Sequence, residues 1–391
     1  MSENLSDDII INILAWLPLK EVARMRVVCK RWNSLTLEQH FLCTSFSRNT
    51  NHSIVSFFLK DSPRCNVSYV PLPEDTVNNH HITPDLSFIP STPATDKGQI
   101  YVTASCSGLL ICCRPNISIS YKSTWYVCNP LTRKFMELEV PEGIARFLAL
   151  AYDPTRSRHY KIIAFGKYNI QMYSSQTRSW RIALHFDRLN HPFRGLHCNN
   201  NNVYWCGSLV YVVRNSLMCF VVDEERVVEM PMPQTPKGWI CAYVGTSSGF
   251  LHMIGFTEEE RLGGVLDVLE LQEGSVEWSV LYRVDLRKVI ELYPGIQRTR
   301  PEFQYFGLRS LFGTGKMIDF LALCPMYVVR GMEERARLGQ LLFSIPGKIM
   351  SYHTENHKFS TVHGDPVAPK SHTNQFQWYQ FHPYNPSLFA L

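Results

Sequence analysis

Three short stretches of the sequence carry residue types and spacings that could support chemistry. The first, GTSSG at residues 245–249, matches the G-x-S-x-G pattern. In that pattern a strained turn between a strand and a helix presents a nucleophilic serine. Here the motif lies between two apolar, strand-like stretches, 240–244 and 250–254, and no helical pattern follows it. The sequence therefore predicts a hairpin turn at this position.

The other two stretches are weaker candidates. Residues 313–316, GTGK, lack both the glycine spacing and the final hydroxyl of a phosphate-binding loop, so they also favour a turn. His353, His357 and His363 have ligand-like spacing, but they lie in a strand–turn–strand stretch. Solvated turn histidines are therefore expected there in place of a metal site. We expect no catalytic residues, no metal and no cofactor.

Composition narrows the class of protein. The chain has 391 residues, of which 45% are hydrophobic and 19% charged, and its net charge is +5. These values are typical of a folded protein and give little support for nucleic-acid binding. The 12 cysteines form no C-x-x-C pair, which favours free thiols in a reducing compartment. Without an evident signal peptide or membrane-spanning run, we expect a protein of the cytoplasm and/or nucleus with no membrane partner.

The elements that could organise function begin with residues 5–41. Ser6, Asp7 and Asp8 are typical of a helix start, with Ser6 as the expected capping residue. Pro18 should end this helix, and the pattern predicts helices over about 7–16, 19–25 and 27–35. Between Ile9 and Leu17 every residue except Asn12 is apolar, so the first helix is apolar almost all round. A segment this small cannot cover both faces alone. A partner or the rest of the chain must cover one of them.

The order of residues in this segment resembles an F-box, through Leu5-x-Asp7-Asp8, Ile13-Leu14, Leu17-Pro18, Val22, Arg24, Val27-x-Cys29-Lys30-x-Trp32 and Phe41. Ser6 stands where the family most often has proline. The resemblance implies docking onto the Skp-type adaptor of a cullin-RING ubiquitin ligase. We expect the adaptor contacts to lie among Leu5, Ile9, Ile13, Leu14, Leu17, Pro18, Val22, Val27 and Trp32. Some of these must instead form the internal core of the F-box, and the sequence alone does not separate the two groups.

From about residue 53 onward, short apolar or alternating runs separated by turn residues replace the helical pattern. A strand, a polar turn and a strand that begins with an aromatic or branched residue recur along this region. The anchors of the repeat are separated by 45, 48, 50 and 81 residues, and they are Phe135, Trp180, Val228, Trp278 and Phe359. A period of 45–50 residues with about four strands per unit is typical of a β-propeller blade and does not suit a sandwich.

The repeat region resembles the kelch-like, F-box-associated region of plant F-box proteins. The predicted fold is therefore a small all-α F-box of three short helices at residues 1–48, followed by an all-β domain at 49–391. The all-β domain is expected to be a β-propeller of six or seven kelch-like blades. The aromatic run at 376–381 is expected to pair with the first strands near Ile54 and to close the ring.

The resemblances imply a substrate-recognition subunit of an SCF-type E3 ubiquitin ligase that carries out no bond chemistry itself. Its partners would be the Skp-type adaptor, the cullin reached through it, and a protein target that the sequence does not identify. Target contacts are expected in the insertions at 187–194, 293–302 and 330–339, because such contacts usually lie in loops. Two alternatives stay open: an interaction scaffold without substrate turnover, and an enzyme built on a propeller.

Overall fold

The computed structural model describes residues 5–50, 56–60, 67–72, 85–90, 100–115, 123–141, 148–166, 168–187, 202–213, 216–301, 317–330, 339–364 and 380–389. The chain divides into two compact units, which are described separately. The first comprises residues 1–213, 218–229 and 379–391, and the second comprises 214–217 and 230–378. None of the helices in the described ranges is long and apolar enough to cross a membrane.

Helices open the described part of the chain: α1 (Asp7–Leu14), α2 (Leu19–Met25), α3 (Lys30–Leu35) and α4 (Gln39–Thr50). The first two match the predicted helices closely. The third begins at Lys30 and not at Val27, and α4 was not predicted. The predicted domain boundary after residue 48 falls inside α4, and the division at that residue stays a prediction. Ser6 occupies the N-cap of α1, but its side chain makes no capping hydrogen bond, so its expected role as a cap was wrong.

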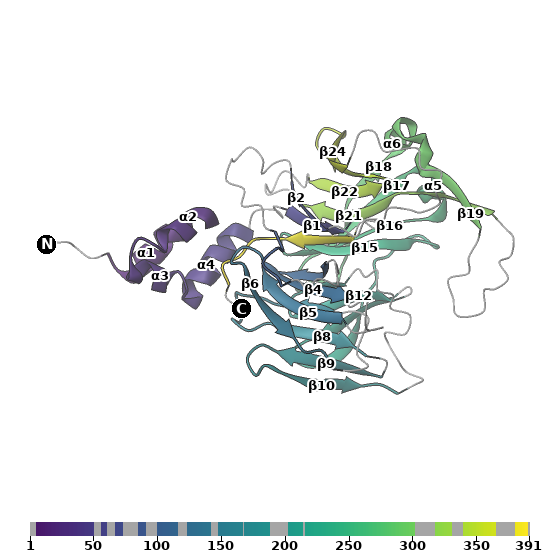
Figure 1. The fold of residues 1–391 in the computed structure, drawn as a ribbon. Coiled ribbons are helices and arrows are strands. Elements are labelled where there is room, and N and C mark those ends of the chain that lie inside the picture. Colours follow the sequence, from purple (N-terminus) through teal and green to yellow (C-terminus); the bar gives the residue numbers. More distant parts are fainter. Residues whose placement is uncertain are drawn as a thin grey trace. The chain divides into compact units, whose positions relative to one another are not determined.

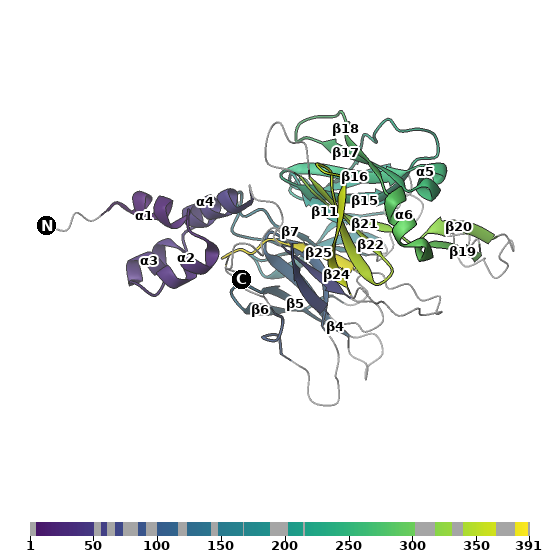
Figure 2. The ribbon, with the colours of Figure 1, turned by 90° about the horizontal axis from the view of Figure 1, so that it is seen from above.

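Antiparallel sheets make up the rest of the first unit (Figures 1 and 2). The first sheet pairs β2 (Val67–Pro71), β1 (Ser56–Lys60) and β25 (Gln380–Tyr384). The second consists of β3 (Tyr101–Cys106), β4 (Leu109–Pro115), β5 (Ser123–Asn129) and β6 (Lys134–Leu138). The third consists of β7 (Leu148–Ala151), β8 (Lys161–Phe165), β9 (Asn169–Ser174) and β10 (Ser179–His185). The fourth consists of β11 (Asn202–Trp205), β12 (Ser208–Val213), β13 (Ser216–Val221) and β14 (Arg226–Met230).

Strand β25 comes from the C-terminal end of the chain and completes the first sheet, which otherwise consists of β1 and β2. It pairs antiparallel with β1, so that Ser56 lies opposite Tyr384 and Phe58 lies opposite His382. The predicted pairing of the aromatic terminal run with the first strands is confirmed. The paired residues are 380–384, whereas 376–379 of the predicted run lie outside the described residues.

Neighbouring sheets of the first unit bury apolar side chains between them. One core lies between the first and second sheets and contains Phe58, Leu110 and Tyr384. Another joins the third and fourth sheets through residues such as Ile163 and Tyr211. A third core runs from the second and third sheets into the N-terminal helices. Within this unit, adjacent sheets therefore cover each other's apolar faces, as stacked blades require.

The second unit contains two further sheets of the same kind. They consist of β15 (Ile240–Ser247), β16 (Phe250–Phe256), β17 (Val265–Leu271) and β18 (Ser279–Asp285), and of β21 (Cys324–Val329), β22 (Gln340–Ile345), β23 (Lys348–His353) and β24 (Lys358–Gly364). Inserted around them are α5 (Glu258–Gly263), α6 (Arg287–Leu292), the 3-10 helix η2 (Pro294–Ile296) and the hairpin of β19 (Gln297–Pro301) and β20 (Met317–Leu321). The insertion of α6, η2 and this hairpin accounts for the 81-residue gap between the last two anchors.

Turns with positive φ recur at equivalent places in most of the four-stranded sheets. Between their first two strands, a residue and a glycine both have positive φ at Ser107–Gly108, Cys206–Gly207 and Ser248–Gly249. This is the geometry of a tight type I′ hairpin. Directly before the fourth strand, a left-handed residue recurs as Arg133, Arg178, Glu225 and His357. The predicted anchors lie between one residue before and two residues after the start of the fourth strands of the five sheets, so the predicted repeat is confirmed.

The two tryptophan anchors show why a large side chain recurs there. The indole N–H of Trp180 donates to the carbonyl of Glu139 at 2.7 Å, and that of Trp278 donates to the carbonyl of Pro231 at 2.9 Å. Both acceptors lie in the connection that leads to the first strand of the same sheet, Glu139 directly after β6 and Pro231 directly after β14. Each tryptophan thus ties the fourth strand to the segment that enters its own sheet.

Candidate functional site on the N-terminal helices

One face of α1 forms the core of the helical cluster. Ile10, Ile11 and Leu14 are buried there together with Val22 of α2 and Phe41 of α4. The spacing of one, three and four residues within α1 places its three members on one side of the helix. Leu14 is only 1% exposed, so it contributes to the stability of the cluster and is not available to a partner.

The opposite face of α1 carries a line of exposed apolar side chains. Leu5, Ile9, Ile13 and Trp16 follow one another at intervals of four, four and three residues, and Trp16 is 75% exposed. We call these four residues the apolar stripe. Because helical residues four apart are surface neighbours, Ile9 and Ile13 lie side by side on α1, and Leu5 and Trp16 extend the stripe in the chain just before and just after the helix. Contiguous exposed apolar side chains are a common feature of protein–protein interaction sites.

A second group of exposed apolar residues lies at the turns beside α3. Val27, which is 87% exposed, and Val28 lie between α2 and α3, and Leu37 follows α3. The sequence predicted that the two valines begin a helix over about 27–35. The structure places them in a turn, where they gain no cover from the core.

The nine predicted contact residues fall into three groups by burial. Exposed are Leu5, Ile9, Ile13, Pro18 and Val27; half-buried are Leu17 and Trp32; buried are Leu14 and Val22. The exposed residues that the sequence reasoning missed are Trp16, Val28 and Leu37. Trp16 could have been found from its spacing, since it lies seven residues after Ile9 within the predicted helix 7–16.

Arginine side chains fix the helices to one another. Arg31 of α3 donates from Nε to Asp7 Oδ1 at 2.8 Å and from Nη2 to the carbonyl of Leu5 at 2.7 Å. Arg26 donates to both the hydroxyl and the carbonyl of Thr36, each at 3.1 Å. Burial lowers the pKa of the Arg26 guanidinium. These bonds explain part of the basic cluster in the sequence as internal supports of the helical domain.

The GTSSG motif is a hairpin turn, as predicted. Ser247 is the last residue of β15 and pairs with Phe250 of β16, and no helix follows. The Ser247 side chain is buried, and its hydroxyl accepts a hydrogen bond from the Arg330 amide at 3.0 Å. This environment does not present the serine to a substrate.

The histidine cluster makes local contacts within its sheet. His357 Nδ1 lies 2.6 Å from the Tyr352 hydroxyl, and His353 Nε2 lies 3.5 Å from the Ser360 hydroxyl. Across the described ranges, no three His, Cys, Asp or Glu side chains are grouped so that they could hold a metal ion. Residues 313–316 lie outside those ranges.

His252 of β16 is a buried histidine with an unusual environment. It is 0% exposed, and within the described part of the chain neither ring nitrogen has a hydrogen-bond partner. Its register neighbour on β17 is Glu270, which accepts a hydrogen bond from Arg330 at 3.1 Å. Burial, followed by the positive charge of Arg330, lowers the pKa of His252 from 6.5 to about 3.

This pKa predicts a pH-dependent stability. Between about pH 6.5 and 3 the unfolded chain binds a proton at His252 that the folded chain does not, so stability falls as the pH is lowered. The contribution of one such group is at most about 1.4 kcal/mol per pH unit. We expect His252→Phe to remove this part of the pH dependence, measured by urea unfolding at pH 7.5, 6.0 and 5.0. An unchanged slope in the variant would show that His252 is not the titrating group.

Comparison with known proteins agrees with this organisation. The model of the F-box domain matches residues 2–44, and that of the F-box associated beta propeller domain matches residues 55–246. The chain is similar to F-box protein At5g07610 of Arabidopsis thaliana, with 27% identity over 95% of this chain and 89% of that protein. It is also similar to F-box protein At5g49610 of the same plant, with 24% identity over 87% and 91%, and to F-box/kelch-repeat protein At3g61590, with 26% identity over 54% and 51%.

The match also defines the all-β region. In the described residues, one three-stranded sheet and five four-stranded sheets have the make-up of blades, while β19 and β20 form a separate hairpin. The region is a six-bladed β-propeller. Of the two predicted blade numbers, six and seven, six is therefore the correct one. This chain therefore carries an F-box domain followed by an F-box-associated β-propeller domain, and its relatives are plant F-box proteins.

Proposed function

We propose that this protein is the substrate-recognition subunit of an SCF-type E3 ubiquitin ligase. The observation that carries the proposal is the apolar stripe of α1, which stays exposed although the opposite face of the same helix is already packed. The F-box would bind a Skp-type adaptor through the stripe, with Pro18 and Val27 as further contacts. The buried Leu14 and Val22 would support the binding face from inside.

The propeller would bind the protein to be modified. Its role is proximity, since holding a target lysine near the charged ubiquitin of the ligase raises the effective concentration of the reacting groups. The protein itself would be non-catalytic and would act in the cytoplasm and/or nucleus. Of the predicted target loops, 187–194 and 330–339 lie mostly outside the described residues, and 293–302 contains η2 and β19.

The test is ubiquitin transfer that depends on the adaptor-binding face. The double variant Ile9→Glu, Ile13→Glu should not bind the adaptor. Proximity labelling with this variant in plant cells should enrich the targets, because they are bound but not turned over. Each target should then be ubiquitinated in a reconstituted adaptor–cullin complex containing the wild-type chain, but not the variant. Bound proteins that are never modified under either condition would contradict this proposal and favour the scaffold alternative.

A further inference from the structure

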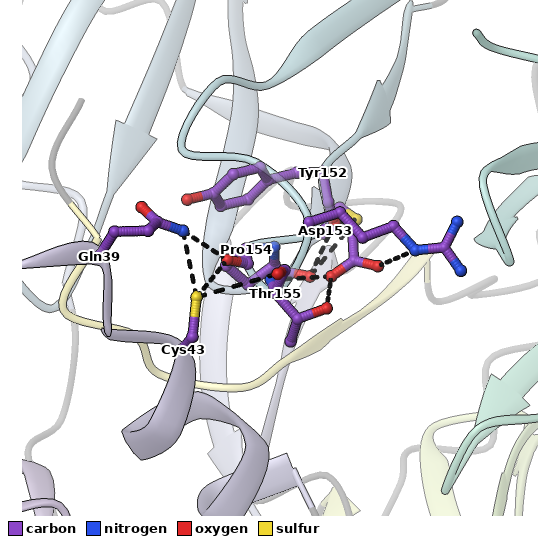
Figure 3. A network of polar contacts seen from close by, with 9 residues as sticks. Gln39, Cys43, Tyr152, Asp153, Pro154 and Thr155 are labelled. Carbon is purple, nitrogen blue, oxygen red and sulfur yellow. Dashed lines mark hydrogen bonds and ion pairs between the residues drawn. The ribbon is translucent and has the colours of Figure 1, made fainter. Parts of the chain in front are cut away.

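Helix α4 is fixed to the propeller part of the first unit by two side chains one helical turn apart. Gln39 Nε2 donates to the carbonyl of Pro154 at 2.8 Å, and the Cys43 thiol donates to the same carbonyl at 3.0 Å (Figure 3). Gln39 also lies 3.1 Å from the Cys43 sulfur. One face of α4 thus contacts the backbone of the turn that follows β7.

The turn that receives α4 has its own internal supports. The Asp153 carboxylate accepts hydrogen bonds from the amide and the hydroxyl of Thr155, at 2.9 and 2.6 Å. The carbonyl of Tyr152 accepts from the Ser107 hydroxyl at 2.9 Å and from the Cys106 thiol at 3.2 Å. These bonds hold the backbone on both sides of Pro154, whose carbonyl accepts from α4.

An aromatic side chain from the C-terminal segment completes the contact. Phe389 is 3% exposed and packs edge-to-face against Phe46 of α4, with 5.7 Å between ring centroids. It packs in the same way against Tyr152, at 5.5 Å. Phe389 therefore lies between the helix and the turn and contacts both. Aromatic pairs of this geometry add about 0.5–1.5 kcal/mol each beyond the area they bury.

The position of Phe389 is set by the second sheet. The buried Asn129 donates from Nδ2 to the carbonyls of both Ser387 and Phe389, each at 2.9 Å. The Ser387 hydroxyl donates to the carbonyl of Ser107 at 3.0 Å. Gly108 has φ +84°, and a Cβ there would lie 2.2 Å from Ser387 Oγ, so only glycine allows this approach. The segment that follows β25 thus has a specified path to α4.

We propose that these contacts make Phe389 a positioning residue that fixes the F-box in one orientation relative to the blades of the first unit. The α4 joint is defined by Gln39, Cys43, Phe46, Tyr152, Pro154 and Phe389. The part of this proposal that concerns ubiquitin transfer rests on the proposed function. A rigid joint keeps the bound target at a fixed distance from the adaptor, whereas a loose joint spreads it over a larger volume and lowers its effective concentration.

Distance measurements test the joint itself without any ligase. Spin labels would be introduced through a noncanonical amino acid, because Cys29 is exposed and would also react. The positions are the exposed Asn33 of α3 and Gln176 in the turn after β9. We expect one narrow distance distribution in the wild type and a distribution at least about twofold broader in Phe389→Ala, since the helix loses its packed contact. Phe389→Leu should restore a narrow distribution.

The control separates loss of position from loss of stability. Phe220 is fully buried between the third and fourth sheets and is not part of the α4 joint. Phe220→Ala should lower the melting temperature at least as much as Phe389→Ala and leave the distance distribution narrow. Equal widths in Phe389→Ala and the wild type, or equal broadening in Phe220→Ala, would overturn the proposal.

A second readout addresses transfer. Lysines of the propeller serve as transfer sites in place of a bound target. With the complete adaptor–cullin ligase present, ubiquitin transfer to them should fall about fivefold in Phe389→Ala, while adaptor affinity stays within about twofold of the wild type. An unchanged transfer rate in a variant with a broadened distribution would refute the positioning role. Absence of any transfer by the wild type would refute the proposed function instead, and the distance measurement would still decide the joint.

Discussion

Replacing Ile9 and Ile13 by glutamate is expected to abolish binding of the Skp-type adaptor and leave the protein folded. Both side chains lie in the middle of the apolar stripe and are about half exposed. Neither belongs to the buried core of the helical cluster, so a charge at either position stays in water in the free protein. In a complex the same charges would be buried without partners. Two central contacts that each cost about 2 kcal/mol or more together cost at least about 4 kcal/mol, which lowers the affinity by at least about 700-fold.

Two matched variants separate an interface effect from a folding effect. Val276 in the second unit is an exposed valine, and Val276→Glu should leave both adaptor binding and the melting temperature unchanged. Leu14 lies on the buried face of α1, and Leu14→Ala should destabilise the helical cluster by about 2–5 kcal/mol. Calorimetric titration with purified adaptor and thermal melts would provide both quantities. Full adaptor affinity in the Ile9, Ile13 double variant would exclude the stripe as the binding face.

The blades could be predicted from the sequence because their signals are local. The aromatic or branched anchor beside the fourth strand, the polar turn before it and the residue–glycine turn after the first strand all lie within short stretches of chain. Their repetition therefore appears directly in the sequence. The number of blades could not be predicted from the sequence in the same way. The first sheet takes one of its strands from the C-terminal end, and inserted elements interrupt the last repeat.

The sequence predicted the adaptor-binding face only as a group of nine residues, in which exposed residues and buried core residues were mixed. Both sides of α1 are apolar, and periodicity identifies two faces without saying which one the protein covers itself. The choice depends on where α2 and α4 pack. Val22 and Phe41 lie against Ile10, Ile11 and Leu14, which leaves Ile9 and Ile13 outside. This information is tertiary and has no local signal.

Helix α4 was missed for a related reason. Its sequence, QHFLCTSFSRNT, is rich in residues with low helix propensity and has no acidic residue in its first turn. Much of its stability must come from contacts made far away in the chain, such as those of Phe46 with Phe389 and of Gln39 with Pro154. The α4 joint was therefore beyond prediction from the N-terminal segment, although the aromatic terminal run correctly indicated that the C-terminus returns to the first strands.

That return is the basis of the second large expected effect. Removing residues 374–391 should sharply lower the melting temperature of the propeller, because β1 and β2 would remain as a two-stranded hairpin, which is marginal in water. The loss would uncover Phe58, whose ring packs edge-to-face on Tyr384 with centroids 5.2 Å apart. It would also remove the bond from the Ser105 hydroxyl to the carbonyl of Pro383 at 2.6 Å, which connects β25 to the second sheet.

The single substitution Tyr384→Ala sets a lower limit for this effect. Tyr384 is 1% exposed, and truncating a buried aromatic side chain costs about 3–5 kcal/mol. For a folding unit of roughly 200 residues this corresponds to a fall of about 10 °C in melting temperature, and the deletion should exceed it. Adding a synthetic peptide of residues 374–391 to the truncated chain should raise the melting temperature again, since the peptide can refill the position of β25 beside β1. A truncated chain that melts like the wild type would show that β25 is dispensable for closing the first sheet.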